Sequence, residues 1–373
     1  NHDPGENQAD PADLQQAVRG NFQELAKADL TQPQSERLEQ LREWTQVNLP
    51  ALLGTFRERR ERGSVRNCHG DMHLGNMVDH EGTVRIFDCI EFNESFRWID
   101  VIDELAFLAM DLKYRNHEEL ANRVINDYIT RRGDHEGLRS LDFYRIYRAL
   151  VRCKVEYLED EDPTLSETAD RYLRVARSYL NRSTGGLLIT HGFSGTGKTT
   201  ATQELLERHG AIRLRSDVER KRLAGLPFQS RPNTKQTQEL YSTEMTEKTY
   251  GELLDRAETV VRGGFPVIVD ATFLKQHFRE RFRERAKELG VPFGILHFEL
   301  PDGELRERLR NRNREETVSD AGVDVLERQR KIADPLTEEE GSFVLDVPGG
   351  QPTEENHRVI AELLDGTPDQ DER

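Results

Sequence analysis

The sequence predicts an α/β protein with two domains: a mainly helical domain over residues 1–182 and, over residues 183–373, a parallel sheet between helices. Two observations predict this arrangement. Apolar residues recur at helical spacing through most of the first half, and strands alternate with helices after residue 186. The length of 373 residues also suggests two domains, at about 100–200 residues each.

The chain begins with a polar stretch, residues 1–13, which we expect to be frayed or disordered. From Leu14 to Arg62 the apolar residues mostly follow a helical period. Pro33 and Pro50 interrupt this stretch, and we expect them to divide it into separate helical pieces.

A pair of short strands comes next, at residues 77–78 and 84–87, separated by a turn at Glu81-Gly82. Helical periodicity then returns over residues 99–180. The glycine-bearing polar segment 181–186 is the predicted domain boundary.

Five apolar segments are predicted to form the strands of the second half. Because helical segments separate them, we expect the strands to be parallel and covered on both faces. The predicted strands are residues 187–191, 211–215, 266–270, 293–299 and 342–346.

The composition narrows the choice of partners and compartment. Sixty-nine acidic residues outnumber 53 basic ones, for a net charge of -16, which argues against general nucleic-acid binding but leaves room for a local basic site. No run approaches the roughly 18 consecutive apolar residues of a membrane span. The three scattered cysteines fit neither a disulfide framework nor a C-x-x-C zinc site, so we expect a cytoplasmic protein.

The strongest motif is Gly192-Phe193-Ser194-Gly195-Thr196-Gly197-Lys198-Thr199, which matches G-x-x-x-x-G-K-[ST] between a strand and a helix. Such a loop presents backbone N–H groups to a phosphate chain at the start of a helix. Lys198 would reach the β- and γ-phosphates, and the Thr199 hydroxyl would join the shell of Mg²⁺. The predicted nucleotide-binding residues are Gly192, Ser194, Gly195, Thr196, Gly197, Lys198, Thr199 and Thr200.

Two carboxylates follow other strands of the same predicted sheet. Asp217 comes just after the second strand and is the candidate base that takes a proton from an acceptor hydroxyl, with Arg220 as a candidate clamp for the acceptor. An alternative is that Asp217 is a helix N-cap, and the two roles are compatible. Asp270 ends the third strand and is the candidate carboxylate for magnesium.

These segments resemble the P-loop kinases of the zeta-toxin, polynucleotide-kinase and gluconate-kinase group. The matching pieces are the loop 192–199, the string Ser216–Lys221, the strand end Val269–Thr272 and the segment Leu305–Ala321. The resemblance implies a P-loop NTPase fold that uses ATP and Mg²⁺ to phosphorylate a hydroxyl, and it leaves the acceptor open.

An arginine-rich segment lies where such kinases carry a lid. A high density of arginines usually indicates a solvated helix face. In a lid, however, arginines supply positive charge to the transferring phosphoryl group. Arg308 and Arg312 are one helical turn apart and are the candidates for this role. The arginines of the segment are Arg306, Arg308, Arg310, Arg312 and Arg314.

A second kinase motif lies in the first half. His69-Gly70-Asp71-Met72-His73-Leu74-Gly75-Asn76 places an Asp and an Asn five residues apart, and Ile86-Phe87-Asp88 follows after a turn. In a protein-kinase-like catalytic loop, an Asp at this spacing faces the acceptor hydroxyl, and an Asn and a second Asp hold magnesium.

This half resembles the aminoglycoside phosphotransferase family, whose H-G-D-x-x-x-x-N loop and following Asp match here. The resemblance implies a protein-kinase-like carboxyl-terminal lobe in which Asp71 is the base and Asn76 and Asp88 are metal ligands. The residues before His69 contain no counterpart of the family's lysine-bearing amino-terminal lobe. Either that lobe was cut away or the domain serves as a scaffold.

The leading interpretation is therefore a cytoplasmic Mg²⁺-dependent kinase that binds ATP, or GTP, and a small-molecule acceptor. One alternative is a nucleotide-dependent switch whose hydrolysis controls a partner or the first domain. Another is that Asp71 is the working base in a longer native chain. The acceptor, the preferred nucleotide and the oligomeric state stay open.

Overall fold

The computed structural model describes residues 11–160, 162–180, 185–230, 233–312 and 323–364, without the side chains of residues 234–235, 311–312 and 323–324. The chain divides into two compact units. The first unit consists of Asn1–Ile125 and Glu136–Asn181, and the second of Asn126–His135 and Arg182–Arg373.

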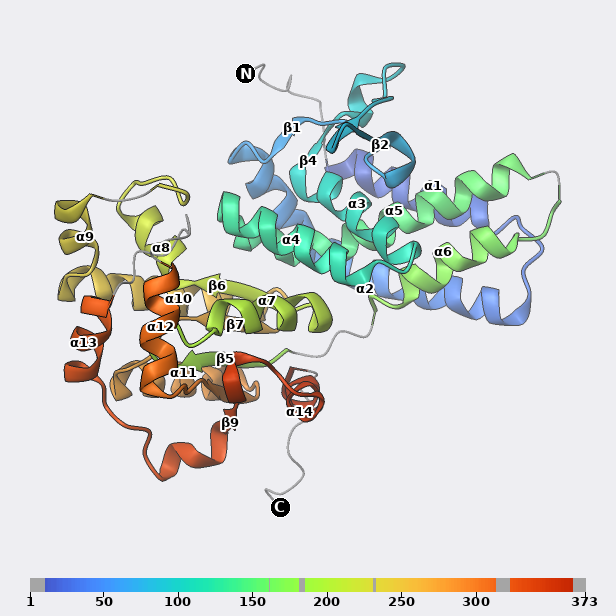
Figure 1. Ribbon diagram of the computed structural model, residues 1–373. Coiled ribbons are helices and arrows are strands. Elements are labelled where there is room, and N and C mark those ends of the chain that lie inside the picture. The colour runs from blue at the N-terminus through green and yellow to red at the C-terminus, as the bar shows by residue number, and fades with distance from the viewer. Residues whose placement is uncertain (1–10, 161, 181–184, 231–232, 313–322, 365–373) are drawn as a thin grey trace. The chain divides into compact units, whose positions relative to one another are not determined.

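The first unit is mostly helical (Figure 1). Its helices are α1 (Pro11–Leu25), α2 (Gln32–Glu61), α3 (Val101–Tyr114), α5 (Leu138–Glu159), α6 (Glu167–Arg177) and the part of α4 (Glu118–Arg132) before Asn126. Its strands form two antiparallel pairs, β1 (Val65–Asn67) with β4 (Trp98–Asp100) and β2 (Met77–His80) with β3 (Thr83–Ile86). Short 3₁₀ turns are η1 (Leu74–Asn76), η2 (Glu94–Phe96) and, shared with the second unit, η3 (His135–Gly137).

The expected helix break at Pro50 is wrong, because α2 continues through this residue. Pro33 lies in the first turn of α2, where the missing N–H has no helical partner to lose. Pro50 does cost the helix one hydrogen bond. Packing compensates for it, since apolar side chains of α2 are buried on both sides of the proline: Leu38, Leu41, Leu49 and Phe56.

The predicted hairpin at residues 77–87 is confirmed. Glu81 and Gly82 form its turn with φ values of 55° and 75°, as a two-residue hairpin turn requires. The β1–β4 pair was not predicted, because strands of three residues are too short to show a period. The helix α1 begins at Pro11, within the stretch expected to be disordered.

The second unit is built on a five-stranded parallel sheet with the order β6-β7-β5-β8-β9 (Figure 1). All five predicted strands are confirmed to within two residues at each end. They are β5 (Leu187–His191), β6 (Ile212–Arg215), β7 (Val267–Asp270), β8 (Phe293–His297) and β9 (Val344–Asp346).

Helices cover both faces of this sheet, which confirms the predicted α/β architecture. On one face, Leu188 and Ile268 pack with α7 and α14, and α10 and α11 lie against the other face. The helices are α7 (Lys198–His209), α8 (Ser216–Leu223), α9 (Thr234–Leu240), α10 (Thr243–Arg262), α11 (Gln276–Leu289), α12 (Asp302–Arg312), α13 (Val323–Ile332) and α14 (Glu354–Leu364). The 3₁₀ turns η4 (Glu339–Phe343) and η5 (Pro348–Gly350) flank β9.

The backbone at the edge strand β6 is hydrogen-bonded to the side chain of a residue that is far away in the sequence. Asn126 donates from Nδ2 to the carbonyl of Ala211 (2.9 Å), and its Oδ1 accepts from the N–H of Arg213 (2.8 Å). An edge strand otherwise exposes such groups. Residues 126–135 therefore complete the second unit.

Among the described residues, no helix combines the length and the hydrophobicity that a bilayer span requires.

Candidate functional site

The phosphate loop joins β5 to α7 in a conformation that depends on its glycines. Gly192, Gly195 and Gly197 have φ values of 141°, 92° and 96°, which favour glycine over other residues. A Cβ atom on Gly192 would also lie 2.3 Å from the carbonyl oxygen of Phe298. The loop can therefore fold tightly and point its N–H groups at the start of α7, where anions bind.

Lys198 is the first residue of α7 and is buried. Its Nζ atom donates to the carbonyl oxygens of Gly192 (2.9 Å) and Phe193 (2.6 Å), so the ammonium group lies along the loop itself. A phosphate chain held by the loop would therefore meet this charge at close range.

The helix α13 also contacts the loop. Gln329 accepts from the N–H of Ser194 through Oε1 (3.0 Å) and donates from Nε2 to the Ser194 hydroxyl (2.9 Å). Leu326 joins Leu305 and Leu309 of α12 in an apolar cluster against which Phe193 packs. Nothing in the sequence around Gln329 indicated this role.

The end of β7 lies next to the loop strand β5 in the sheet. Asp270 is buried there, with Oδ2 3.5 Å from the Thr202 hydroxyl of α7. Arg213 of β6 donates to the Thr199 carbonyl (2.9 Å) and to Gln203 Oε1 (2.7 Å). Burial, followed by the charge of Arg215, lowers the pKa of Arg213, and Asp270 acts in the opposite direction.

Asp217 lies in the first turn of α8, whose N-cap is Arg215. The alternative interpretation of Asp217 as an N-cap is therefore wrong. The Asp217 Oδ2 atom accepts a hydrogen bond from Arg215 Nη2 (2.7 Å), and the Asp217 side chain is 30% exposed. A partly exposed carboxylate at the carboxyl edge of the sheet is accessible to a hydroxyl group of a ligand.

Arg220 follows one turn later on α8 and is only 8% exposed. Its guanidinium lies over the ring of Tyr241, 4.5 Å from the ring centroid. Its Nε atom is buried and has no hydrogen-bond partner among the described residues.

The lid candidates are only partly described. Arg308 pairs with Glu304 (2.7 Å), one turn earlier on α12, and one of its Nη atoms lies 3.7 Å from the place that a Cβ atom on Gly197 would occupy. The side chains of Arg310 and Arg306 also lie on α12, and Arg306 pairs with Asp302 and Glu327. The Arg312 side chain and Arg314 lie outside the described residues.

The structure thus brings the loop residues, Asp270 and Arg308 into one neighbourhood, and it places Asp217 and Arg220 together on α8. The sequence analysis assigned no role to Arg213, Arg215 or Gln329. The alternation Arg213-Leu214-Arg215 was a usable signal, because it places both arginines on the opposite side of the strand from Leu214.

The second predicted site, in the first unit, is held by carboxylates of α3. Glu104 accepts from the backbone N–H groups of His69 (2.7 Å) and Gly70 (3.1 Å). Asp103 forms a buried bidentate pair with Arg148, which in turn donates to the Gly70 carbonyl (3.2 Å). These bonds fix the loop that carries Asp71.

Asp71 and Asn76 are in direct contact. Asn76 Nδ2 donates to Asp71 Oδ2 and to the Asp71 carbonyl (both 3.0 Å), and His73 Nε2 lies 3.3 Å from Oδ2. Burial alone would raise the pKa of Asp71, but the hydrogen bond and charge of His73, the bond from Asn76 and the charge of Arg152 outweigh it and lower the pKa. Asp71 is therefore a carboxylate at neutral pH.

Asp88 is exposed just beyond β3, with a φ of 61°. The preceding Phe87 donates its N–H to the Asn76 carbonyl (3.0 Å), and its own carbonyl lies 2.8 Å from His69 Nε2. The predicted trio of Asp71, Asn76 and Asp88 therefore comes from segments that are hydrogen-bonded to one another.

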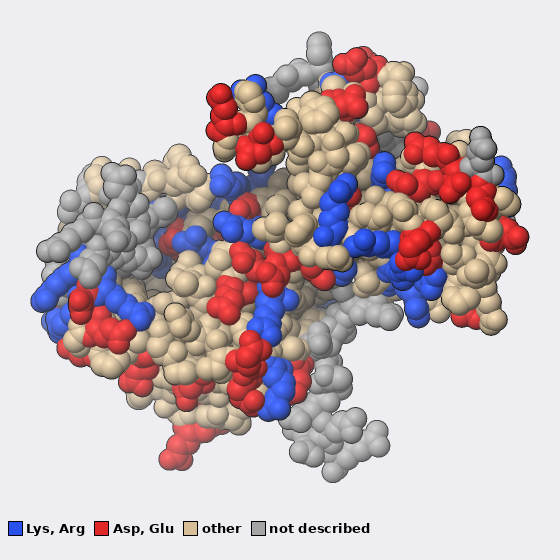
Figure 2. All heavy atoms as spheres, turned by 45° about the vertical axis from the view of Figure 1, so that its right-hand side comes forward, with Lys and Arg blue, Asp and Glu red and all other residues tan. Residues whose placement is uncertain are grey.

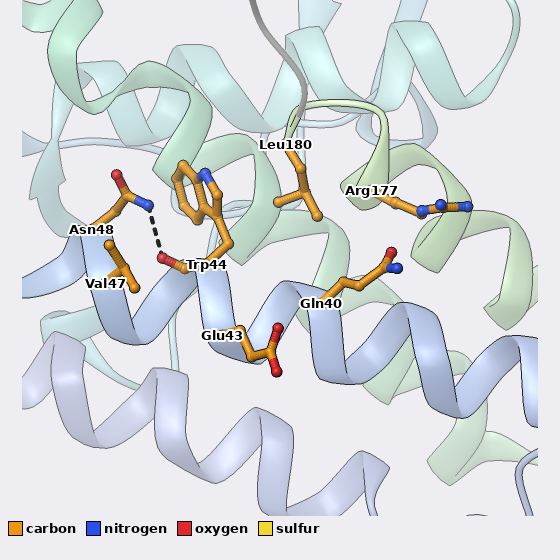
Figure 3. A pocket seen from close by; sticks show the side chains of 7 residues that line it. All are labelled: Gln40, Glu43, Trp44, Val47, Asn48, Arg177 and Leu180. Atoms are coloured by element: carbon orange, nitrogen blue, oxygen red, sulfur yellow. Dashed lines mark hydrogen bonds between the residues drawn. The ribbon is translucent and has the colours of Figure 1, made fainter.

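Two cavities in the first unit include none of the predicted residues. One of about 440 Å³ lies between α2 and the end of α6 (Figure 3), and one of about 570 Å³ lies between α1 and α2. Figure 3 shows that the first is lined by Gln40, Glu43, Trp44, Val47, Asn48, Arg177 and Leu180.

On the face that Figure 2 shows, acidic and basic side chains of the described residues are intermixed.

A family match falls within the second unit. Residues 187–336 match the model of a family described as an AAA domain. Uncharacterised proteins of Mycobacterium tuberculosis and Mycobacterium bovis are 32% identical over 220 residues, which are 58% of this chain and 44% of each relative. The match therefore spans less than half the length of these relatives.

Solved structures of kinases resemble part of the chain more distantly. A sugar kinase from a Janibacter species is 20% identical and covers 49% of this chain and 96% of its own, with a TM-score of 0.37. A gluconokinase from Sinorhizobium meliloti is 19% identical and covers 50% and 93%, with a TM-score of 0.33. At these scores the similarity assigns no activity.

Proposed function

We propose that the second unit is a Mg²⁺-dependent kinase that binds ATP at residues 192–199 and transfers its γ-phosphoryl group to a hydroxyl of a small molecule. The observation that carries this proposal is the glycine-dependent loop between β5 and α7, with the ammonium group of Lys198 held along it. The family match over residues 187–336 lies on the same unit.

The residues present fit a magnesium ion. Thr199 and Asp270 offer hydroxyl and carboxylate oxygens, the ligand types that Mg²⁺ prefers, at the start of α7 and the end of β7. When bound, the ion would neutralise charge on the phosphate oxygens. Arg213 holds the first turn of α7 through the Thr199 carbonyl and so positions this hydroxyl.

Asp217 would accept the proton of the acceptor hydroxyl. Its ion pair with Arg215 keeps the carboxylate oriented at the edge of the sheet. Lys198 and Arg308 would place positive charge on the transferring group. Closure of α12 and α13 over the loop would exclude water, which favours transfer over hydrolysis.

A calorimetric titration of Mg²⁺–ATP and Mg²⁺–GTP into the wild type and the Lys198→Ala variant tests the proposal. We expect one site that is lost in Lys198→Ala, and unchanged affinity would refute the assignment. In the Asp217→Ala variant we expect nucleotide binding without phosphoryl transfer. If ATP hydrolysis is unaffected in that variant and a partner is captured only with nucleotide, the second unit is a switch.

The first unit is a second candidate phosphotransferase site, because Asp71 is an ionised carboxylate bonded to Asn76. In this reading Asp71 is the base, and Asn76 and Asp88 hold the metal. The Asp88→Ala variant separates the two candidates in the same titration. A second nucleotide site that is lost in Asp88→Ala supports this function, and an unchanged titration contradicts it.

A further inference from the structure

The cavity of about 570 Å³ between α1 and α2 has an apolar floor. The floor consists of two pairs of residues, each pair one helical turn apart and at most 8% exposed: Val18 and Phe22 of α1, and Thr45 and Leu49 of α2. The Thr45 hydroxyl donates to the Leu41 carbonyl of its own helix (2.7 Å), so its O–H group is satisfied. Small-molecule pockets have volumes of about 300–1,000 Å³ and mostly apolar walls. The size and the floor of this cavity therefore suit an apolar molecule.

The rim of the same cavity carries positive charge. Arg19 of α1 is exposed and forms no ion pair with any residue that the structure describes. Arg42 of α2 lies over the floor, with its guanidinium carbon 5.7 Å from the centroid of the Phe22 ring. The ion pair of Arg42 with Glu39 (2.7 Å) joins two partly exposed side chains. Because such pairs contribute little to stability, an acidic ligand can take the place of Glu39.

Negative charge is absent from the walls. None of the described residues that line this cavity is an aspartate or a glutamate, although the chain holds 69 of them among 373 residues. The cavity on the opposite side of α2 differs, because Glu43 and Arg177 line it with both signs of charge. An anion is therefore favoured between α1 and α2. The other lining residues there are neutral: Gln15, Gln23, Ala26, Gln46 and Pro50.

We propose that this cavity binds a small molecule with an apolar body and one acidic headgroup, the body on the floor and the headgroup at Arg19 and Arg42. Guanidinium groups bind carboxylates through charge-assisted hydrogen bonds, and the buried apolar surface adds affinity. The ten residues before α1 contain no large apolar side chain that could fill the floor instead. The proposal is independent of the kinase function, because the cavity includes no residue of either candidate phosphotransferase site.

Octanoate and 1-octanol are the probes, because they share an apolar chain and differ in the charge of the headgroup. Each is titrated calorimetrically into the full chain at pH 7 and constant ionic strength, where the carboxyl group is ionised. 2-Naphthoate, an aromatic carboxylate, is titrated in parallel. The tighter of the two carboxylates assigns the body of the ligand as aliphatic or aromatic.

We expect one octanoate site, with 1-octanol at least about tenfold weaker. Arg19→Gln and Arg42→Gln should each weaken octanoate binding roughly tenfold, and the double variant should bind it no better than 1-octanol. Gln46→Trp places a large side chain at the rim and should weaken both probes. Arg57→Gln, an exposed change on α2 away from this cavity, is the matched control and should bind as the wild type does. Circular dichroism melts show whether each variant is folded.

Four results would overturn the proposal. They are a wild type that binds neither carboxylate, 1-octanol binding as tight as that of octanoate, octanoate binding that the double arginine variant retains in full, and octanoate binding that Gln46→Trp leaves unchanged. Sedimentation tests the remaining occupant, since a wild-type dimer that Gln46→Trp converts to a monomer would mean that a second copy of the chain fills the cavity. The kinase proposal stands under any of these results.

Discussion

Replacement of Asn126 by Ala should destabilise the second unit, although this residue lies far before the phosphate loop in the sequence. Asn126 is 4% exposed and satisfies two backbone groups of the edge strand, the Ala211 carbonyl and the Arg213 N–H. Alanine would leave both groups unpaired in a buried environment. Each such group costs about 1–3 kcal/mol. We expect a total loss of about 2–6 kcal/mol, a large part of a typical stability of about 5–15 kcal/mol.

Urea unfolding followed by far-ultraviolet circular dichroism measures this loss. With a slope of about 2 kcal/mol per molar, the midpoint of the transition of the second unit should fall by about 1–3 M. Glu119→Ala, an exposed change on the same helix, should stay within about 0.5 kcal/mol of the wild type. An unchanged midpoint in Asn126→Ala would refute the view that residues 126–135 complete this unit.

Three further outcomes follow from contacts within the second unit. Arg279→Gln should lower the free energy of unfolding by about 3–5 kcal/mol, because it leaves the Glu340 carboxylate, now paired at 2.6 Å, without its partner. A melting temperature that falls by less than about 2 °C, the shift expected from about 1 kcal/mol, would contradict this. Burial and the charge of Arg256 lower the pKa of His135 to about 3. Between pH 7 and 5 only the unfolded state therefore binds a proton at this histidine. The free energy of unfolding should fall by about 2 kcal/mol as the pH is lowered through this range. His135→Gln should remove that part of the pH dependence in urea titrations, and an identical slope would exclude it. Gln329→Leu should increase amide hydrogen exchange in α13, because its two bonds to the phosphate loop are lost, and unchanged exchange would show that the apolar cluster alone holds the helix.

The parts of the fold and site that the sequence predicted are those with a local pattern. The phosphate loop follows from eight consecutive residues, and Asp270 follows from an apolar strand that ends in a carboxylate. Parallel strands then bring such ends to the same edge of the sheet. The sequence also placed Asp71 and Asn76 in one loop, and in the structure Asn76 donates a hydrogen bond to the Asp71 carboxylate.

The parts that the sequence did not predict depend on contacts between distant residues. Asn126 is 85 positions from Ala211, and Gln329 is 135 positions from Ser194. No period or motif connects such pairs. Pro50 was misjudged for a related reason, since the tertiary packing of α2 outweighs the local preference of proline to end a helix.

Three arginines at and after the end of β6 have different bonding partners in the fold, which the sequence alone does not reveal. Arg213, Arg215 and Arg220 lie within eight residues and look equivalent in the sequence. In the fold, Arg213 holds the first turn of α7 and Arg215 is neutralised by Asp217. Arg220 is as buried as Arg213, but its guanidinium stacks on Tyr241 and its Nε has no hydrogen-bond partner among the described residues. It lies one helical turn from Asp217, so three arginines that are close in the sequence reach different partners once the strand gives way to the helix.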